Sequence, residues 1–414
     1  MYKTLLILLF PITLFAQDFT VYHTGPTTDS LTIPQGGICL MGGATEDDNA
    51  MRWFLNRANG GDVLVLRASG ADGYNDYFYS DLGVNVHSVE TIVCNNANAS
   101  NSSYIHSKIN EAEAIWFAGG DQWNYISYWR GTAIDSLINK AISERNIVIG
   151  GTSAGMAIQG KYYFSAQNGT ITSGSALSNP FDATCTVDSL SFIQNDVLNH
   201  TITDTHFDSP DRKGRLSVFM AKILSDFGDL EATAIACNEY TAVCIDENGL
   251  AKVFGGYPTY DEFAYFVQIN CEIPSNEPET YIIGNPLTWN QTGKALSVCR
   301  VPGTATGLNS FDLNDWKTNS GGSWYNWSVE NGVFTETIGV EPNCTAGISN
   351  EMSEFENLPK MITNQLIKIE STQYKTVIVS DLSSKILLQI NNQNQQFTID
   401  LSTFSNGIYF LHYE

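Results

Sequence analysis

The stretch NIVIGGTSAG, residues 146–155, joins an apolar strand to a glycine-bounded turn. Its first half is continuously apolar, which is typical of a strand that is buried on both faces of a parallel sheet. Its second half places Ser153 between Gly151 and Gly155, ahead of an apolar segment that can start a helix. Small residues suit a sharp strand-to-helix turn, which exposes the serine and aims the next backbone amide, that of Ala154, at a developing oxyanion. The stretch therefore predicts an α/β fold with Ser153 on a nucleophile elbow.

Similar apolar segments recur upstream of this stretch: ICLMGG at 38–43, DVLVLR at 62–67 and AIWFAGG at 114–120. Amphipathic segments alternate with them and supply covering helices over residues 46–59 and 132–145. This alternation predicts a mostly parallel sheet with helices packed on it. In such sheets the active site lies at the carboxyl ends of the strands, where the glycine turns of this chain occur.

The turn from Ala118 to Gln122 would reach the same edge of the sheet as Ser153. A glycine amide there, which we assign to Gly120, can complete an oxyanion hole, and Gln122 can hydrogen-bond a substrate. The alternative is an ordinary glycine turn with Asp121 as a helix cap.

A serine nucleophile needs a general base, and His206 is the best placed of the six histidines. Its alternative role is that of a solvated loop histidine. The third member of a triad is a carboxylate that fixes the imidazole tautomer. Glu239 is our candidate for that carboxylate, and Asp246 is its local rival.

The charge of the chain, its N-terminal segment and its cysteines indicate which partners it binds and in which cellular compartment it works. The net charge of −23 disfavours nucleic acid as a partner, because the phosphate backbone is itself anionic. Residues 1–16 read MYKTLLILLFPITLFA, which has the pattern of a signal peptide, and no later segment approaches the roughly 18 apolar residues of a membrane span. Eight cysteines fit an oxidising compartment, where Cys237 with Cys244, or Cys271 with Cys299, could be disulfides. Neither the cysteines nor the histidines form a metal-ligand cluster, so we expect no metal and no cofactor.

The character of the sequence changes near Pro302. Residues 303–366 are rich in Trp, Asn and Gly, and we expect a small β extension or linker there, with a carbohydrate-binding patch as the alternative. Alternating strands follow over 367–414 and predict a separate small β-sandwich. The catalytic domain is accordingly expected to span residues 17–302.

Several motifs in register resemble the signatures of cyanophycinases. They are GGTSAG at 150–155, GGDQ at 119–122, DTHF at 204–207 with GRL at 214–216, and NEYTA at 238–242. The resemblance covers roughly residues 35–302, and a set of motifs in one order is far more specific than any single one. It implies a three-layer α/β sandwich, like that of class I glutamine amidotransferases and aspartyl dipeptidases, with a doubly wound sheet.

The resemblance also implies a function and its residues. The triad would be Ser153, His206 and Glu239, acting without metal on peptides linked through aspartate, including a poly-aspartate that carries arginine on its β-carboxyls. Asp204, Arg212 and Arg215 would join Gln122 in binding the substrate. The alternative for the two arginines is that they pair with local carboxylates such as Asp208 and Asp211. Two positions depart from the family pattern: Thr205 replaces a glutamine and Pro210 replaces an arginine. These departures weaken the assignment of one particular substrate.

The C-terminal segment, with DLSSK at 381–385 and SNGIY at 405–409, is similar to the sorting domains of type IX secretion in Bacteroidetes. It implies export through the periplasm to the outer surface or the medium, with the secretion machinery as a partner. The sequence thus predicts an exported serine peptidase that hydrolyses β-linked aspartyl peptides. The alternative is a catalytically silent surface protein that keeps the fold as a binding module. A homodimer is the assembly that we consider.

Overall fold

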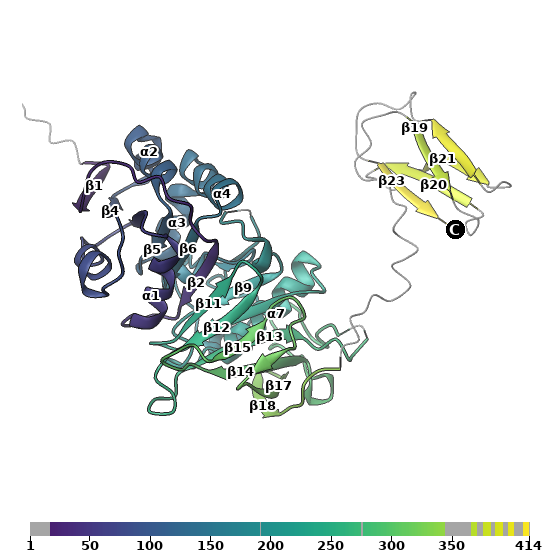
Figure 1. The fold of residues 1–414 in the computed structure, drawn as a ribbon. Coiled ribbons are helices and arrows are strands. Elements are labelled where there is room, and N and C mark those ends of the chain that lie inside the picture. The colour runs from purple at the N-terminus through teal and green to yellow at the C-terminus, as the bar shows by residue number, and fades with distance from the viewer. Residues whose placement is uncertain are drawn as a thin grey trace, which may run out of the picture. The chain divides into compact units, whose positions relative to one another are not determined.

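The computed structural model describes residues 17–343, apart from 191 and 275, and the backbone of five strands between residues 366 and 413. The expected signal peptide, residues 1–16, lies outside the described residues. The chain divides into two compact units, Met1–Asn343 and Cys344–Glu414 (Figure 1). The first unit contains every residue that we expected in the catalytic site.

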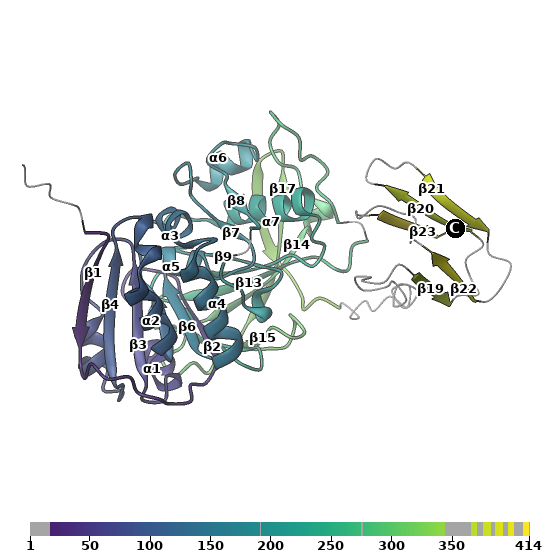
Figure 2. The ribbon, with the colours of Figure 1, turned by 90° about the horizontal axis from the view of Figure 1, so that it is seen from above.

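A ten-stranded sheet forms the framework of the first unit. Its order is β1-β4-β3-β5-β6-β2-β11-β12-β15-β16, and Figure 2 shows β1, β4 and β3 following one another at one end. The strands from β4 to β2 are parallel, and antiparallel strands extend the sheet on both sides. The bounds are β1 Phe19–Thr24, β2 Gly37–Met41, β3 Asp62–Arg67, β4 Ser88–Cys94, β5 Ala114–Phe117, β6 Val148–Thr152, β11 Ala242–Asp246, β12 Leu250–Phe254, β15 Asn309–Asp312 and β16 Asn319–Ser320. An α/β fold with a parallel core is therefore confirmed, although the sheet as a whole is mixed.

Both faces of the parallel strands are buried, because successive side chains of a strand point to opposite faces. Along β2, Ile38 and Leu40 join one apolar cluster, and Cys39 and Met41 join another. The first cluster contains residues of α2, α3 and α4, and the second contains residues of α1. The helices span Asp48–Arg57 (α1), Ser103–Glu111 (α2), Gln122–Trp129 (α3) and Ala133–Arg145 (α4). The continuous apolar strands of the sequence thus reflect burial on two sides.

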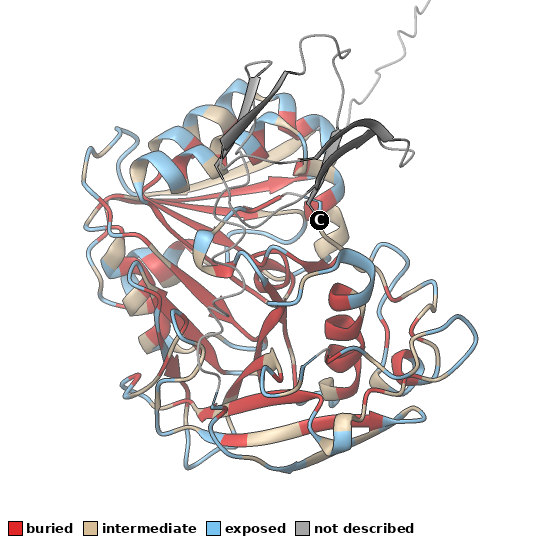
Figure 3. Cartoon of the chain, turned by 90° about the vertical axis from the view of Figure 1, so that its right-hand side faces the viewer, coloured by how far each residue is buried: buried red, intermediate tan, exposed pale blue. Residues whose placement is uncertain are grey.

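A second, six-stranded sheet completes the unit, and the sequence analysis did not anticipate it. Its order is β18-β17-β14-β13-β10-β9, and only β9 and β10 among its neighbours are parallel. Helix α7, Lys213–Phe227, is buried along most of its length beside this sheet (Figure 3). The strands span β9 Thr201–Asp204, β10 Thr233–Cys237, β13 Phe263–Ile269, β14 Leu296–Pro302, β17 Ser323–Glu330 and β18 Val333–Ile338.

The first unit extends well past the boundary that we expected at Pro302. Strands β15 and β16 continue the large sheet, and β17 and β18 continue the second sheet. Trp324 packs in the large core and Trp327 packs in the core around α7. Residues 303–343 therefore belong to the compact unit, because Trp324 and Trp327 are buried in its two cores.

The C-terminal unit contains two small antiparallel sheets. Strand β19 pairs with β22, and β20 pairs with both β21 and β23. Their bounds are β19 Leu366–Glu370, β20 Thr376–Asp381, β21 Ile386–Asn391, β22 Gln396–Asp400 and β23 Tyr409–Tyr413. These strands agree with the alternating pattern of the sequence over residues 367–414.

The cysteines differ from the pairings that we considered. Cys237, Cys244 and Cys299 are free and buried, whereas Cys271 is disulfide-bonded. Neither Cys237 with Cys244 nor Cys271 with Cys299 is therefore a disulfide in this structure. The nearest thiol neighbour of Cys244 is instead Cys39, at 3.6 Å across β2 and β11. Within the described residues, no helix has both the length and the hydropathy needed to cross a bilayer.

Candidate active site

Ser153 lies on a strained turn between β6 and the short helix α5, Ala154–Ala157. Its φ of 51° is positive, a conformation that costs energy for a residue with a side chain. The flanking glycines are required by close packing: a Cβ on Gly155 would lie 2.0 Å from the carbonyl oxygen of Phe117, and one on Gly151 would lie 2.5 Å from Gly155. The G-x-S-x-G pattern thus forms a sharp turn because only glycine fits beside β5.

His206 and Glu239 meet Ser153 from the ends of two other strands. His206 follows β9 and Glu239 follows β10, both in the second sheet. Ser153 Oγ lies 2.7 Å from His206 Nε2, and His206 Nδ1 lies 2.7 Å from Glu239 Oε1. The rival carboxylate, Asp246, ends β11 and caps a turn through the amides of Asn248 and Leu250. The structure therefore joins Ser153, His206 and Glu239 in one chain of hydrogen bonds.

This arrangement can activate the serine hydroxyl. A carboxylate accepts the hydrogen on Nδ1 and so leaves Nε2 as the nitrogen that accepts from Ser153. The side chains of His206 and Glu239 are about one-quarter exposed, at 25% and 26%, so a substrate can approach the site. Serine, imidazole and carboxylate in this order are the components of a hydrolytic triad.

The turn that contains Gly119 and Gly120 lies beside the serine. A Cβ on Gly119 would be 3.7 Å from Ser153 Cβ, and the backbone φ of Gly120 is +153°. The hydroxyl of Tyr125, a buried residue of α3, donates to the carbonyl oxygens of Ala118 at 2.7 Å and Gly119 at 3.2 Å. Because these carbonyls are held from within the core, the turn is fixed in its place beside Ser153.

Two of the residues expected to bind the substrate, Asp204 and Arg215, form a buried ion pair with each other. Asp204 is 2% exposed and Arg215 is 3% exposed. Arg215 Nε donates to Asp204 Oδ2 at 3.0 Å, and its Nη2 pairs with Oδ1. The structure differs here from the role expected for them, because a substrate could reach neither group without breaking a buried bidentate ion pair. The pair instead joins α7 to the end of β9, two residues before His206.

Arg212 and Gln122, the other two expected substrate-binding residues, each donate to a backbone carbonyl oxygen. Arg212 Nη1 donates to the carbonyl oxygen of Thr205 at 2.9 Å, directly before His206. Its buried Nε has no protein partner among the described residues, and burial lowers the pKa of this guanidinium. Gln122 Nε2 donates to the carbonyl oxygen of Phe164 at 3.3 Å. Arg212 thus has donor capacity that the protein does not use.

Asp208 is a residue of this site that the sequence analysis missed. Its Oδ1 accepts the backbone N–H of Glu239 at 2.9 Å and thereby holds the carboxylate residue of the triad. In the sequence, Asp208 stands two residues after His206, and we considered it only as a local partner of the arginines. An Asp in the turn after the histidine was the available signal.

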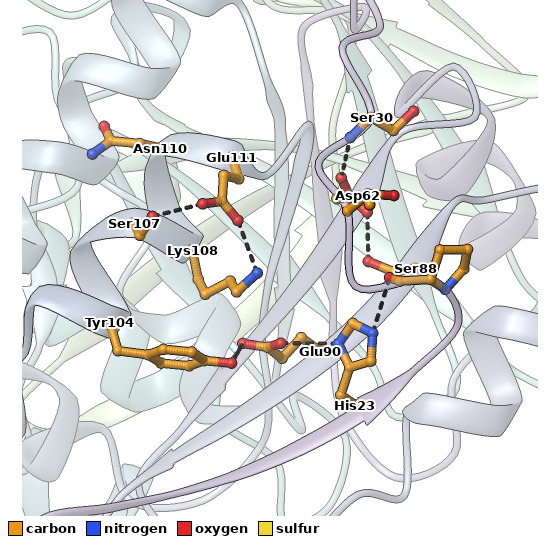
Figure 4. Close-up of polar contacts among 12 residues, drawn as sticks. His23, Ser30, Asp62, Ser88, Glu90, Tyr104, Ser107, Lys108, Asn110 and Glu111 are labelled. Atoms are coloured by element: carbon orange, nitrogen blue, oxygen red, sulfur yellow. Dashed lines mark hydrogen bonds and ion pairs between the residues drawn. The ribbon is translucent and has the colours of Figure 1, made fainter.

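A second polar site lies at the opposite, amino edge of the parallel strands (Figure 4). It is a pocket whose polar lining includes His23, Asp62, Ser88, Glu90, Lys108 and Glu111. His23 Nδ1 lies 2.9 Å from Glu90 Oε2, Tyr104 donates to Glu90 Oε1 at 3.0 Å, and Lys108 donates to Glu111 at 2.8 Å. Its charged groups are thus largely paired with one another. Among the described residues no group of three or more His, Cys, Asp or Glu side chains is arranged to hold a metal ion.

Comparison with known proteins gives two family matches. Residues 63–253 match the model of peptidase family S51, and residues 363–414 match that of the secretion system C-terminal sorting domain. No curated protein matches the chain.

Two crystal structures of similar proteins are peptidases. One is a peptidase from an acI-B1 Actinobacterium, with 12% identity, coverage of 54% of this chain and 89% of that chain, and a TM-score of 0.39. The other is a Listeria monocytogenes EGD-e protein described as a candidate peptidase E, with 16% identity, coverage of 53% and 97%, and a TM-score of 0.33.

The family matches define the class of the protein as a serine peptidase. More particularly, the chain carries a peptidase family S51 domain of the cyanophycinase and peptidase E type, followed by a secretion sorting domain. The resemblance to cyanophycinases noted in the sequence is therefore confirmed at the level of the family. The sorting domain makes the protein one that is secreted or displayed on the cell surface.

Proposed function

We propose that this exported peptidase works through a catalytic triad of Ser153, His206 and Glu239. The observation that supports it is the continuous contact from Ser153 Oγ to His206 Nε2 and from Nδ1 to Glu239 Oε1, each 2.7 Å long. The three residues come from two sheets and are far apart in the sequence. A contact of this kind has the order and geometry of groups that act together in acyl transfer.

The reaction proceeds through an acyl-enzyme. Ser153 Oγ bonds to the scissile carbonyl carbon while His206 Nε2 takes the hydroxyl proton, and Glu239 stabilises the resulting imidazolium. The backbone N–H groups of Ala154 and Gly120 donate to the oxyanion. The tetrahedral intermediate then breaks its C–N bond, and the amine leaves with the proton from His206. A water repeats the sequence on the ester, which releases the carboxylic acid and returns the proton to Ser153.

We propose peptides linked through the β-carboxyl of aspartate as the substrates, such as cyanophycin or its fragments. Support comes from the family motifs and from Arg212. Its Nε is buried and has no partner within the described part of the chain, and its Nη1 donates to the carbonyl oxygen of the residue that precedes His206. A guanidinium pairs well with a free aspartyl carboxylate. Asp204 and Arg215 are then part of the wall behind this site. Pro210 offers no charge or donor where the family has an arginine, so we expect looser binding of these substrates than in relatives with that arginine.

Export by type IX secretion completes the proposal. The sorting domain supports a route across both membranes with the secretion machinery as the partner. A substrate of this enzyme must then be extracellular, or reach the enzyme at the cell surface.

Labelling with a fluorophosphonate probe tests the mechanism directly. The full-length secreted protein should form a covalent adduct at Ser153, and the Ser153→Ala variant should form none, because only an activated serine reacts readily. A folded wild-type protein that resists the probe and hydrolyses no peptide would instead be a silent binding module.

A substrate screen tests the specificity. Purified enzyme is offered cyanophycin, β-aspartyl dipeptides and α-linked peptides of the same composition. We expect cleavage of the β-linked compounds. Cleavage of α-linked peptides alone would overturn the substrate proposal and leave the triad in place.

A further inference from the structure

The turn at residues 41–43, at the end of β2, is bonded to all three segments of the proposed triad. The Ser153 N–H donates to the Met41 carbonyl oxygen at 3.1 Å, and the His206 N–H donates to that of Gly42 at 2.8 Å. The N–H of Gly42 donates to Thr241 O at 2.9 Å, and the N–H of Tyr240, the residue after Glu239, donates to Gly43 O at 3.0 Å. This 41–43 turn therefore fixes the backbone of the nucleophile, of the base and of the segment after the carboxylate.

The position of β2 explains why one turn can do this. Strand β2 pairs with β6 on one side and with β11 on the other. Ser153 follows β6, Glu239 to Thr241 precede β11, and His206 reaches the same point from the second sheet. The end of β2 is thus the place where the segments from both sheets meet.

Gly43 also contacts the reacting imidazole itself. A Cβ on Gly43 would lie 2.4 Å from His206 Cε1, 2.5 Å from Nε2 and 2.8 Å from Nδ1. No side-chain atom fits at these distances unless the ring moves. The backbone φ of Gly43 is +126°, so glycine is favoured for its conformation as well. Two physical reasons for glycine therefore coincide at this position, and an experiment has to separate them.

Gly42 packs against the carboxylate side of the site. A Cβ there would lie 2.1 Å from the carbonyl oxygen of Asn238, the residue before Glu239. Gly42 does not have a positive φ in the range that disfavours side chains. Its requirement for glycine is therefore one of space alone.

We propose that Gly43 is a positioning residue of this peptidase, whose missing side chain defines where the His206 ring sits, and that Gly42 does the same for the segment of Glu239. The proposal rests on the proposed triad. It predicts that one added methyl group acts on the proton transfer and not on substrate binding.

The test compares Gly43→Ala with Gly169→Ala in the full-length enzyme. Gly169 has a φ of +95° and nothing within 4 Å of an added Cβ, so it reports the backbone cost without contact with the site. We expect kcat of Gly43→Ala to fall by about 100-fold or more with KM nearly unchanged, since a displacement near 1 Å costs about this much. Gly169→Ala should keep the wild-type kcat.

The pH profile distinguishes positioning from general damage. In the wild type, kcat/KM should rise with pH and then level off, because a general base accepts a proton only in its deprotonated form. In Gly43→Ala the plateau should be absent and kcat/KM should keep rising with pH, because hydroxide takes the place of the displaced base. A variant that is merely less stable would keep the wild-type profile with a reduced amount of active enzyme.

Gly42→Ala provides a second route if Gly43→Ala does not fold. It should lower kcat through the Glu239 segment while the fold remains. A folded Gly43→Ala or Gly42→Ala with wild-type kcat and pH profile overturns the proposal. Full activity of Ser153→Ala would instead overturn the triad, so the two failures are distinguishable.

Discussion

The amino and carboxyl edges of the parallel strands differ in which residues have a positive φ and in how their polar groups are paired. At the amino edge, the non-glycine residues with positive φ before β3 and β6 are Asn59 and Asn146, a residue type that tolerates this conformation. At the carboxyl edge, they are Ala44, Ser153, His206 and Tyr240, and alanine, serine and tyrosine do not favour this conformation. A strained backbone conformation persists only where the surrounding contacts hold it in place, and such strain concentrates at functional sites. The carboxyl edge thus carries backbone strain beside the proposed triad, whereas the amino edge uses a residue type that tolerates the conformation.

The two edges also differ in whether their polar groups have hydrogen-bond partners within the protein. At the amino edge, Glu90 is satisfied by His23 and Tyr104 (Figure 4), and Asp62 accepts from Ser30 and Ser88. At the carboxyl edge, Thr152 Oγ1, Asn238 Oδ1 and Arg212 Nε are buried without a protein partner among the described residues. Buried polar groups are costly to leave unpaired. The polar groups of the amino edge are therefore paired within the protein, whereas the carboxyl edge leaves several buried polar atoms without a protein partner among the described residues.

The largest effect should come from removing the nucleophile or the base. Ser153→Ala and His206→Ala should each lower kcat by about 10⁴-fold or more, because the members of a triad act as a unit. Glu239→Gln should be milder but still severe. Peptidase assays combined with near-ultraviolet circular dichroism would check this result, and substantial turnover by a folded Ser153→Ala enzyme would refute the mechanism.

The next largest effect is expected on stability. The carboxyl edge has unpaired polar atoms, but it also contains the buried ion pair of Arg215 and Asp204. Arg215→Ala leaves the carboxylate buried and uncompensated, so the free energy of unfolding should fall by about 3–5 kcal/mol. The exposed pair of Lys140 and Glu144, at 3.7 Å, is the matched control, and Lys140→Ala should change it by about 0.5 kcal/mol or less. Urea titration measures both. An Arg215→Ala enzyme of unchanged stability but raised KM would favour a substrate-binding role for this arginine.

Arg212→Ala should have an intermediate effect, confined to the reactive edge. We expect kcat/KM on β-aspartyl substrates to fall about 10-fold or more, the scale of one lost charge-assisted hydrogen bond. Arg212→Lys is the companion variant, because it keeps the charge but loses the planar fork of donors. If α- and β-linked peptides are cleaved equally well by both the wild type and the alanine variant, the β-aspartyl specificity is removed while the serine peptidase stands.

The smallest effect belongs to the amino edge. Glu113, before β5, accepts the N–H of Asp62 at 2.7 Å, and burial raises the pKa of this carboxyl to about 7. The folded state therefore binds more protons than the unfolded state between about pH 4.5 and pH 7, so stability falls as pH rises through this window.

Glu113→Gln should remove that slope. Relative to the wild type, the variant should gain stability as the pH is raised from 5 to 8, with activity unchanged. Urea midpoints at these two pH values give the comparison. A difference between the two proteins that is independent of pH would contradict the assignment.

The sequence by itself determined the class of fold, the family and the serine. Continuous apolar strands, amphipathic helices between them and a glycine-bounded Ser153 each depend on local rules of burial and backbone freedom. The motifs that contain His206 and Glu239 could also be recognised, because their residue types and their order along the chain are visible in the sequence. What the motifs could not show is which arginine forms a buried ion pair with Asp204, since Arg212 and Arg215 lie three residues apart and look alike in the sequence.

Only the tertiary structure decided the rest. It added the second sheet, drew residues 303–343 into the first unit, and turned Arg215 inward to Asp204. It also showed that the 41–43 turn touches every segment of the proposed triad. These features depend on contacts between residues that are distant in sequence, and a side chain is oriented by the partners that packing brings to it. Local pattern specifies which residues are available, and packing in three dimensions determines which of them meet.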